Sequence, residues 1–320
     1  MHIILITYMR ETEKFNKGME QACLVLKEID PALECIYFTD KPRKLEAHCN
    51  IKMRNIVYPG TKYVRLLKIL EEEQNCLYVS IDNDVQIDIK LFEKYIAQCI
   101  DENIDCSWAR LMAQDNKSLI SKLVAVDKLL SHNLIRPFLW KMKIGLSIPG
   151  QCFVINSKAF KKKLYEFDTF LDDLALGAYI SENYENLKVL ISSSVIGYEF
   201  PNETFEGLCK QRKRWAKGYY QVLKEAKGKD FFGKVCIHGI AYHGIWLLHW
   251  AVFFMVLRFS ITAAMIYILI ISGVTTYKSP RYYIWSIIYQ IVFPIFHIIW
   301  FYNVIKEKIK DNMVKRGENS

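Results

Sequence analysis

The stretch LYVSIDNDVQI, from Leu77 to Ile87, places two carboxylates where an apolar, β-rich run stops. Asp82 and Asp84 are two residues apart, so on a continuing strand they share a face, and at a strand end both can reach one divalent cation. That cation could also hold a diphosphate. Asp-rich turns have the same composition, so the stretch predicts either a metal site or a turn at the end of a strand.

Short β-rich runs alternate with longer amphipathic runs in the first part of the chain. They are, in order, HIILITY (2–8), KFNKGMEQACLVLKEI (14–29), ECIYFTD (34–40), KYVRLLKILEEEQ (62–74) and CLYVSID (76–82). The alternation predicts βαβ units, and therefore an α/β fold with a mostly parallel central sheet. Ligands bind at the carboxyl ends of the strands in such sheets. Thr7, Tyr8 and Asp40 lie at two further strand ends and are candidate binding residues.

The composition excludes several classes of protein. The 320 residues are 52% hydrophobic, which is enough to bury the core of one large or two modest domains. The nine cysteines include no C-x-x-C pair, which argues against a zinc site or a disulfide framework and favours a reducing, cytosolic side. The formal net charge is +9, but the cations cluster beside the apolar C-terminal region without any nucleic-acid-reading motif, so we expect no nucleic-acid partner.

The composition changes after Gly239. From Ile240 to Tyr277 the only charged residue is Arg258, with no turn residue apparent beside it, and from Tyr282 to Ile305 there is no charge. A membrane-spanning helix needs about 20 apolar residues. The sequence therefore predicts an interfacial segment over 240–252 and two membrane spans, over 253–273 and 283–302.

This arrangement also predicts an orientation. The basic tail after Lys306 and the N-terminal domain would both face the cytoplasm, as the positive-inside rule requires, and only the loop over 277–281 would lie outside. The first residues, MHIILITYMRE, resemble a strand and lack the features of a signal peptide. We therefore expect a multi-pass protein of the cell membrane with a cytoplasmic N-terminal domain.

Two further motifs lie between the strands and the apolar region. FDTFLDDLALGAYI contains the pair Asp172-Asp173, which could cap the helix that follows or supply acid and base groups. KQRKRWAKGYY, from Lys210 to Tyr220, packs cations around one indole. For Arg212, Lys213 and Lys217, a basic collar at a membrane surface is as good an interpretation as a binding site.

The order of these motifs is that of a known family. A D-x-D pair, a later acidic pair, Q-x-x-R-W and then a membrane segment resemble the membrane-bound family 2 glycosyltransferases, which include cellulose, chitin and hyaluronan synthases. The resemblance covers roughly residues 1 to 220 and extends loosely into the spans. It implies a GT-A nucleotide-sugar-binding domain over 1–230, an interfacial and transmembrane segment over 231–305 and a basic cytoplasmic tail over 306–320.

The resemblance also implies roles for single residues. Asp82 and Asp84 fall on the motif that holds the metal, Mg²⁺ or Mn²⁺, and the donor diphosphate. Asp173 falls on the general base, and Asp172 stands where many members have Glu. The resemblance places the residues of Q-x-x-R-W beside the diphosphate and the acceptor sugar; they are Arg214 on the donor side, and Gln211 and Trp215 on the acceptor side.

Other matches are looser. Asp40 lies where the family has an acidic residue near the uracil, Lys62 resembles the Lys of a G-K-A-x-A-x-N segment, and Gly150 matches an acceptor-side glycine. Two departures weaken the match at the nucleotide: TDKP stands where Asp-Asp-Gly-Ser is usual, and Leu67 replaces the Asn of the segment.

The predicted function is inverting, metal-dependent transfer of a sugar from a nucleotide-diphosphate donor, a UDP-sugar in the first interpretation, to a polysaccharide or oligosaccharide acceptor at the membrane. Two spans cannot enclose a sugar-wide pore, so this function would need a homo-oligomer or a partner subunit. The alternatives are transfer of one or a few sugars to a lipid-linked acceptor, and a non-catalytic scaffold that only binds nucleotide sugars.

Overall fold

The computed structural model describes residues 2–9, 13–43, 51–58, 60–72, 75–114, 118–160, 167, 169 and 171–317. The chain forms two compact units. We call the first, Met1–Met112 with Ser147–Phe200, the sheet unit, and the second, Ala113–Leu146 with Pro201–Ser320, the helical unit. The predicted domain boundaries at residues 230 and 305 remain a proposal.

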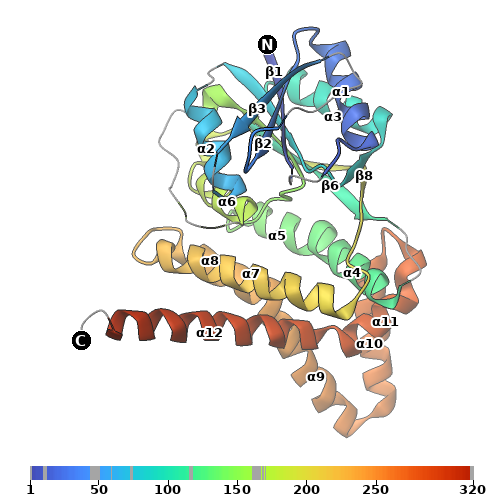
Figure 1. Ribbon diagram of the computed structural model, residues 1–320. Coiled ribbons are helices and arrows are strands. Elements are labelled where there is room, and N and C mark those ends of the chain that lie inside the picture. The colour runs from blue at the N-terminus through green and yellow to red at the C-terminus, as the bar shows by residue number, and fades with distance from the viewer. Residues whose placement is uncertain are drawn as a thin grey trace. The chain divides into compact units, whose positions relative to one another are not determined.

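The sheet unit is built on one sheet (Figure 1), whose eight strands in the described residues run in the order β3-β2-β1-β4-β7-β6-β8-β5. The strands are β1 (His2–Tyr8), β2 (Glu34–Thr39), β3 (Lys52–Val57), β4 (Cys76–Ile81), β5 (Val85–Ile87), β6 (Cys106–Ala113), β7 (Cys152–Asn156) and β8 (Val189–Glu199). β3, β2, β1 and β4 are parallel, as the sequence predicted. β7 is antiparallel to both β4 and β6, and β5 is antiparallel to β8.

The prediction of a mostly parallel sheet is therefore wrong for the second half of the sheet. Parallel neighbours need a crossover connection, usually a helix, that returns the chain to the edge where the previous strand began. α1 (Lys17–Ile29) and α2 (Lys62–Glu72) lie in the connections of the first half. β7 instead enters the sheet at the edge where β6 leaves it, so the two strands run in opposite directions.

Helices cover both faces of the sheet (Figure 1). α1 and α3 (Ile89–Asp101) pack on the face that carries Ile3 and Leu5 of β1, in one continuous apolar core. The opposite face carries Tyr78 of β4, whose hydroxyl donates to the Ile69 carbonyl of α2 at 3.2 Å. Alternate residues of each strand thus face opposite helix layers. α6 (Asp172–Glu182) packs against α2, and two single turns, Ser157–Ala159 and Tyr184–Asn186, complete the unit.

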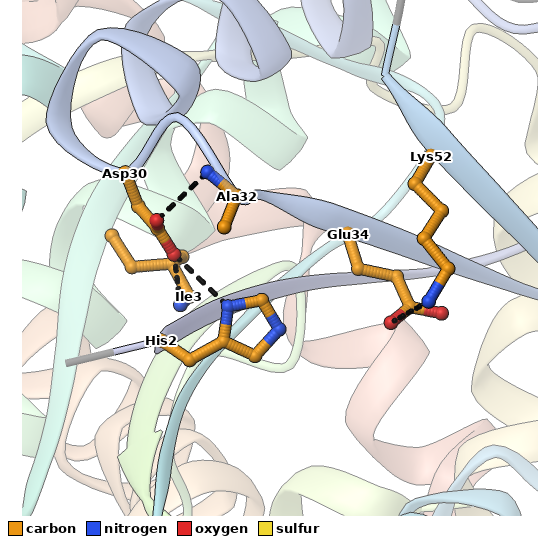
Figure 2. A network of polar contacts seen from close by, with 6 residues as sticks. All are labelled: His2, Ile3, Asp30, Ala32, Glu34 and Lys52. Atoms are coloured by element: carbon orange, nitrogen blue, oxygen red, sulfur yellow. Dashed lines mark hydrogen bonds and ion pairs between the residues drawn. The ribbon is translucent and has the colours of Figure 1, made fainter.

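A polar network fastens the amino-terminal edge of the first strands (Figure 2). Asp30, which follows α1, accepts hydrogen bonds from the backbone N–H groups of Ile3 at 2.7 Å and Ala32 at 3.0 Å, and its Oδ2 lies 3.1 Å from His2 Nδ1. Burial raises the pKa of Asp30, but these donors outweigh it, so the pKa lies below its ordinary value. Asp30 is therefore a structural carboxylate that ties α1 to β1.

The helical unit contains the basic motif and the apolar C-terminal region. Its elements are α4 (Leu119–Leu130), η1 (Ser131–Ile135), α5 (Arg136–Lys141), α7 (Phe205–Ala226), α8 (Phe232–Gly239), η4 (Ile240–Gly244), α9 (Ile245–Phe259), α10 (Ile261–Thr276), η5 (Pro280–Tyr282), α11 (Tyr283–Val292) and α12 (Pro294–Gly317). α7 and α12 lie side by side over most of their length (Figure 1).

The apolar segments differ from the two predicted spans. The span predicted over 253–273 is broken at Ser260, whose backbone is extended and whose hydroxyl accepts from Ala263 N–H at 3.2 Å as the N-cap of α10. The span predicted over 283–302 is divided by a 45° bend where Pro294 begins α12. Proline has no N–H to continue the helix, which explains the break.

One helix in the described part of the chain is long and apolar enough to cross a membrane, Phe232–Phe259, which joins α8, η4 and α9. The segment predicted as interfacial is part of this helix. α11 and α12 together meet the same test only if the bent pair is counted as one span. The residues predicted as a basic tail continue α12 as far as Gly317, and the last three residues lie outside the described part.

Candidate active site

A half-buried lysine gathers three of the predicted site residues at the carboxyl edge of the parallel strands. Lys62 is the first residue of α2, and its side chain is 16% exposed. Its Nζ donates to Asp82 Oδ1 at 2.7 Å and to the Gly150 carbonyl at 2.6 Å, and lies 3.3 Å from Asp172 Oδ2. We call Lys62, Asp82, Gly150 and Asp172 the lysine cluster.

Each partner of Lys62 is placed by a different element. Asp82 follows β4, where its N–H donates to the Gln151 carbonyl at 2.9 Å and its carbonyl accepts from Val85 N–H at 3.1 Å, so the acidic stretch is also a turn. Asp172 begins α6. Gly150 precedes β7, and a Cβ there would lie 3.2 Å from Asp173 Cβ. Glycine therefore permits the close approach of β7 and α6 that forms the cluster.

Tyr8 forms the apolar wall beside this cluster. Lys62 Nζ lies 5.0 Å from the centroid of the Tyr8 ring, which stacks on Phe38 at 5.4 Å and 10°. The Tyr8 hydroxyl and Thr7 Oγ1 are both buried, and neither has a hydrogen-bond partner among the described residues. Buried hydroxyls are ordinarily paired, so these two are exceptions to that pattern.

The lysine cluster holds more negative than positive charge. Burial raises the pKa of Asp82 to about 6 although Lys62 lowers it, and Asp172 adds to the increase. The pKa of Asp172 is likewise raised by burial to about 6, with Lys62 opposing and Asp173 adding. Burial lowers the pKa of Lys62, but the two carboxylates more than offset that effect, so it lies above its ordinary value. The ammonium stays charged between two carboxylates that titrate near neutral pH.

Asp173 and Asp84 lie at the margin of the cluster. Asp173 is half-buried, and its Oδ1 accepts from Leu174 N–H at 2.9 Å within the first turn of α6. Of the acidic pair, Asp172 is therefore the residue that pairs with Lys62. Asp84 is exposed at the turn after β4. Its charge contributes to the raised pKa of Asp82, which places the two carboxylates within electrostatic reach.

Asp40 lies apart from the lysine cluster and forms a different ion pair. It follows β2, its side chain is 72% exposed, and it accepts from Arg65 NH2. Arg65 Nε also donates to the Tyr58 carbonyl at 2.9 Å, and the guanidinium carbon lies 5.9 Å from the Phe38 ring centroid. The sequence interpretation missed Arg65. Its spacing of three from Lys62 on α2 places both cations on one helix face and could have indicated it.

The predicted metal ligands fit one kind of metal site. No group of three or more His, Cys, Asp and Glu side chains in the described residues could hold an ion by itself. Asp82 and Asp84 supply two carboxylates, of which Asp84 is exposed and Asp82 is 32% exposed at its side chain. Mg²⁺ is commonly held by one or two carboxylates together with substrate phosphates, so the pair fits a metal that arrives with a nucleotide.

The Q-x-x-R-W motif lies on α7 of the helical unit, where its neighbour Arg212 is the buried residue. Arg212 is 2% exposed, and its NH2 donates to Asp127 Oδ2 at 2.6 Å. Asp127 Oδ1 accepts from the Tyr289 hydroxyl at 2.7 Å. Arg212 also lies 4.5 Å from the Trp215 ring centroid. The membrane-collar interpretation is therefore wrong for Arg212, which positions Trp215 from the inside of the unit.

The other residues of this motif are open to solvent to different degrees. Arg214, Lys213 and Lys217 are exposed, whereas Gln211 and Trp215 are half-buried. The roles of Gln211, Arg214 and Trp215 toward donor and acceptor remain predictions.

Comparisons with known proteins agree with the motif order. The family model described as glycosyl transferase family group 2 matches residues 79–303, which is more than half of the chain. The chain belongs to this family. This glycosyltransferase matches none of the curated proteins with which it was compared.

Solved structures extend the likeness to the fold. The mannosyltransferase PcManGT from Pyrobaculum calidifontis, in complex with GDP-Man and Mn²⁺, is 13% identical with a TM-score of 0.51, over 96% of this chain and 88% of that chain. S. aureus TarS 1-349 is 11% identical, with a TM-score of 0.44, over 75% of this chain and 72% of that one. Glucosyl-3-phosphoglycerate synthase from Mycobacterium tuberculosis, in complex with Mn²⁺, uridine diphosphate and phosphoglyceric acid, is 12% identical, with a TM-score of 0.44, over 70% and 78%. The likeness to PcManGT supports a GT-A-like α/β fold, and the sheet is mixed.

Proposed function

We propose that this glycosyltransferase moves a sugar, with inversion, from a UDP-sugar to the hydroxyl of a polysaccharide or oligosaccharide acceptor at a membrane. The observation that carries the proposal is the lysine cluster. One ammonium joins Asp82, from the predicted donor motif, to Asp172, from the predicted catalytic pair, and to Gly150, from the predicted acceptor side. A residue that contacts both sides can hold the leaving group and the incoming hydroxyl in one geometry.

The donor would lie along the strand ends. The unpartnered hydroxyls of Thr7 and Tyr8 are suited to hydrogen bonds with the nucleotide, and Asp40 would lie near the base. A divalent ion, Mg²⁺ or Mn²⁺, held by Asp82, Asp84 and the diphosphate, would neutralise the charge of the leaving group. Arg214 would add positive charge to that group.

The acceptor hydroxyl would be activated by Asp173. Its carboxylate accepts the proton as the oxygen attacks the anomeric carbon, and the bond to the diphosphate breaks on the opposite side of the sugar. A single displacement of this kind inverts the anomeric configuration and needs no sugar–enzyme intermediate. Lys62 is paired with Asp172 and Asp82, so in this proposal Asp173 is the carboxylate that takes the proton, and Trp215 would offer a flat apolar surface to the acceptor ring.

A second acceptor class follows from the helical unit. α9 and α10 expose large apolar side chains such as Phe259 at 82% and Ile261 at 69%. Such helices favour attachment to a membrane, and at the cytoplasmic face of the cell membrane a lipid-linked acceptor would be within reach. Transfer of one or a few sugars to a lipid is therefore the alternative to polymer synthesis, which would require a homo-oligomer or a membrane partner for export.

The test is a product analysis with purified protein in lipid vesicles. UDP- and GDP-sugars carrying a radiolabel are supplied with Mn²⁺, and the Asp173→Asn variant serves as the control. A ladder of long chains from a UDP-sugar supports the polymer synthase. One or two sugars on an extractable lipid support the alternative. A protein that binds a nucleotide sugar without transferring it is a scaffold, and the catalytic proposal is then wrong.

A further inference from the structure

α12 is paired with a strongly charged helix along its length. Phe205 of α7 and Phe296 of α12 have ring centroids 5.2 Å apart at one end of the pair. At the other end, Lys224 Nζ lies 2.6 Å from Asp311 Oδ1. Phe205 and Lys224 are 19 residues apart, which is roughly 28 Å of helix.

This pairing is incompatible with a transmembrane α12. A helix that crossed the bilayer in this position would carry the partner helix α7 through the hydrocarbon, a distance of about 30 Å. α7 exposes Lys213, Arg214 and Lys217, and a charged side chain at the bilayer centre is strongly unfavourable. The pair therefore lies outside the hydrocarbon core.

α12 presents an apolar stripe away from its packed side. The packed side contains Phe296, His297 and Trp300, each no more than 2% exposed. The stripe recurs every three or four residues over the length of the helix and consists of exposed Ile295, Ile298, Tyr302, Ile305, Ile309 and Met313. A helix with one apolar face and basic residues beside it, here Lys306 and Lys308, is suited to the plane of the membrane interface.

α9 and α10 form an antiparallel hairpin that is short for a bilayer. His249 Nδ1 of α9 lies 2.8 Å from the Tyr267 hydroxyl of α10, and the chain turns at Ser260. α9 has 15 residues and α10 has 16, which correspond to about 22 Å and 24 Å, less than the hydrocarbon thickness of about 30 Å. Figure 1 shows both helices extending away from α12 within the helical unit.

The segment before α9 does not lengthen the hairpin, because it is docked on α7 and α12. The Tyr219 hydroxyl of α7 donates to the Val235 carbonyl at 3.0 Å. The His243 ring stacks on Trp300 of α12 at 3.8 Å. This segment is docked through one face and still exposes Ile240, but its contacts hold it beside α7, so the part from Ile245 onward is the part that enters the hydrocarbon. Arg258, one residue before the exposed Phe259 at the turn, can extend its side chain toward the far headgroups.

The end of the hairpin returns to the side of α7. Lys122 Nζ of α4 lies 4.3 Å from the Trp285 ring centroid of α11. Ser118, the N-cap of α4, donates its hydroxyl to the Glu203 carbonyl at 2.6 Å, two residues before α7 begins. The start of α11, and with it the segment 277–282, is therefore tied through α4 to the charged helix.

We propose that the helical unit is a monotopic anchor: α12 lies in the interface, and the α9–α10 hairpin dips into the bilayer and returns without crossing it. The partner surface is the bilayer itself. The proposal rests on the membrane attachment in the proposed function and replaces the two predicted spans. It moves the loop over 277–281 from the opposite side of the membrane to the side of α7.

The test uses single added cysteines in the full chain, expressed in its native membrane. No native cysteine lies after Cys236, so a label at position 261 or 278 can be mapped by peptide mass, and a label at position 213 is identified by comparison with the parent protein. The variants are Lys278→Cys, Ile261→Cys at the hairpin turn and Lys213→Cys on exposed α7, with the parent protein as control. A membrane-impermeant maleimide is applied to intact cells and to lysed cells.

The monotopic anchor predicts that Lys278→Cys is labelled in the same preparation as Lys213→Cys, and that Ile261→Cys reacts at least about tenfold more slowly until detergent is added. Labelling of Lys278→Cys and Lys213→Cys from opposite sides would show the two-span arrangement. Rapid labelling of Ile261→Cys from the side opposite to Lys213→Cys would show a crossing hairpin. Either result overturns the proposal while membrane attachment stands. If the chain sediments apart from membranes, attachment itself is wrong.

Discussion

Asp30 and Asp82 lie at opposite edges of the same parallel strands, and their surroundings differ in kind. Asp30 accepts hydrogen bonds from two backbone N–H groups, which keep its pKa below the ordinary value. Asp82 shares one ammonium with Asp172, and burial raises its pKa to about 6. Hydrogen bonds within the fold satisfy Asp30. Asp82 keeps negative charge that could bind a metal ion and substrate.

The largest effect is expected at the proposed base. Asp173→Asn keeps the shape of the side chain but cannot accept the proton, so transfer should fall by at least about 10²-fold. Nucleotide binding and the free energy of unfolding should change little, because the side chain is half-buried and its amide oxygen can still accept from Leu174 N–H. Initial rates and donor titration by calorimetry measure both. Near-normal turnover would transfer the base role to Asp172.

Removing the cation of the lysine cluster should reduce the stability of the fold. In Lys62→Met, Asp82 and Asp172 lose their common ammonium. We expect a loss of about 2 kcal/mol in the free energy of unfolding at pH 7, less than for a fully buried pair, because Asp82 is 32% exposed. Urea denaturation measures it, and Lys62→Arg is the matched control. A Lys62→Met protein as stable as the parent would show that the Lys62 ammonium does not stabilise the carboxylates of Asp82 and Asp172.

The amino-terminal edge should respond in stability alone. Asp30→Asn loses charge-assisted hydrogen bonds, so the free energy of unfolding should fall by about 1 kcal/mol at pH 7 while kcat is unchanged. The folded pKa of Asp30 is lowered from 3.8, so its contribution is present above that pH and is lost as the pH falls through the folded value. Urea denaturation at pH 7 and pH 3 should show the difference shrinking in acid. A difference that grows in acid would contradict the assignment.

The smallest effect is expected at Asp40. Its side chain is 72% exposed, so Asp40→Asn should leave the free energy of unfolding within about 0.5 kcal/mol of the parent. If Asp40 contacts the nucleotide base, the donor KM should rise several-fold with kcat unchanged. Donor titration of initial rates measures this, with Lys41→Gln as the neighbouring control. An unchanged KM would exclude Asp40 from the donor site.

The sequence predicted what local pattern determines. HIILITY and CLYVSID alternate between two buried faces, and their polar ends meet because parallel strands end at one edge. The sequence pattern could not predict contacts between residues that are far apart along the chain. The antiparallel half of the sheet depends on pairing between β7 and β4, which is distant from it in the sequence. The burial of Arg212 depends on Asp127, 85 residues away. The helix break at Ser260 was not predicted, because the residues on both sides are apolar and the N-cap of α10 is evident only from the backbone geometry.

The most direct test of the proposed site is whether cleavage of the donor depends on a metal ion held by Asp82. Release of the nucleoside diphosphate by purified protein is followed while Mg²⁺ or Mn²⁺ is titrated, for the parent and for Asp82→Asn. We expect that release requires metal, stops in excess EDTA, resumes when metal is restored, and needs far more metal in Asp82→Asn. Full turnover of the parent in excess EDTA would contradict this expectation.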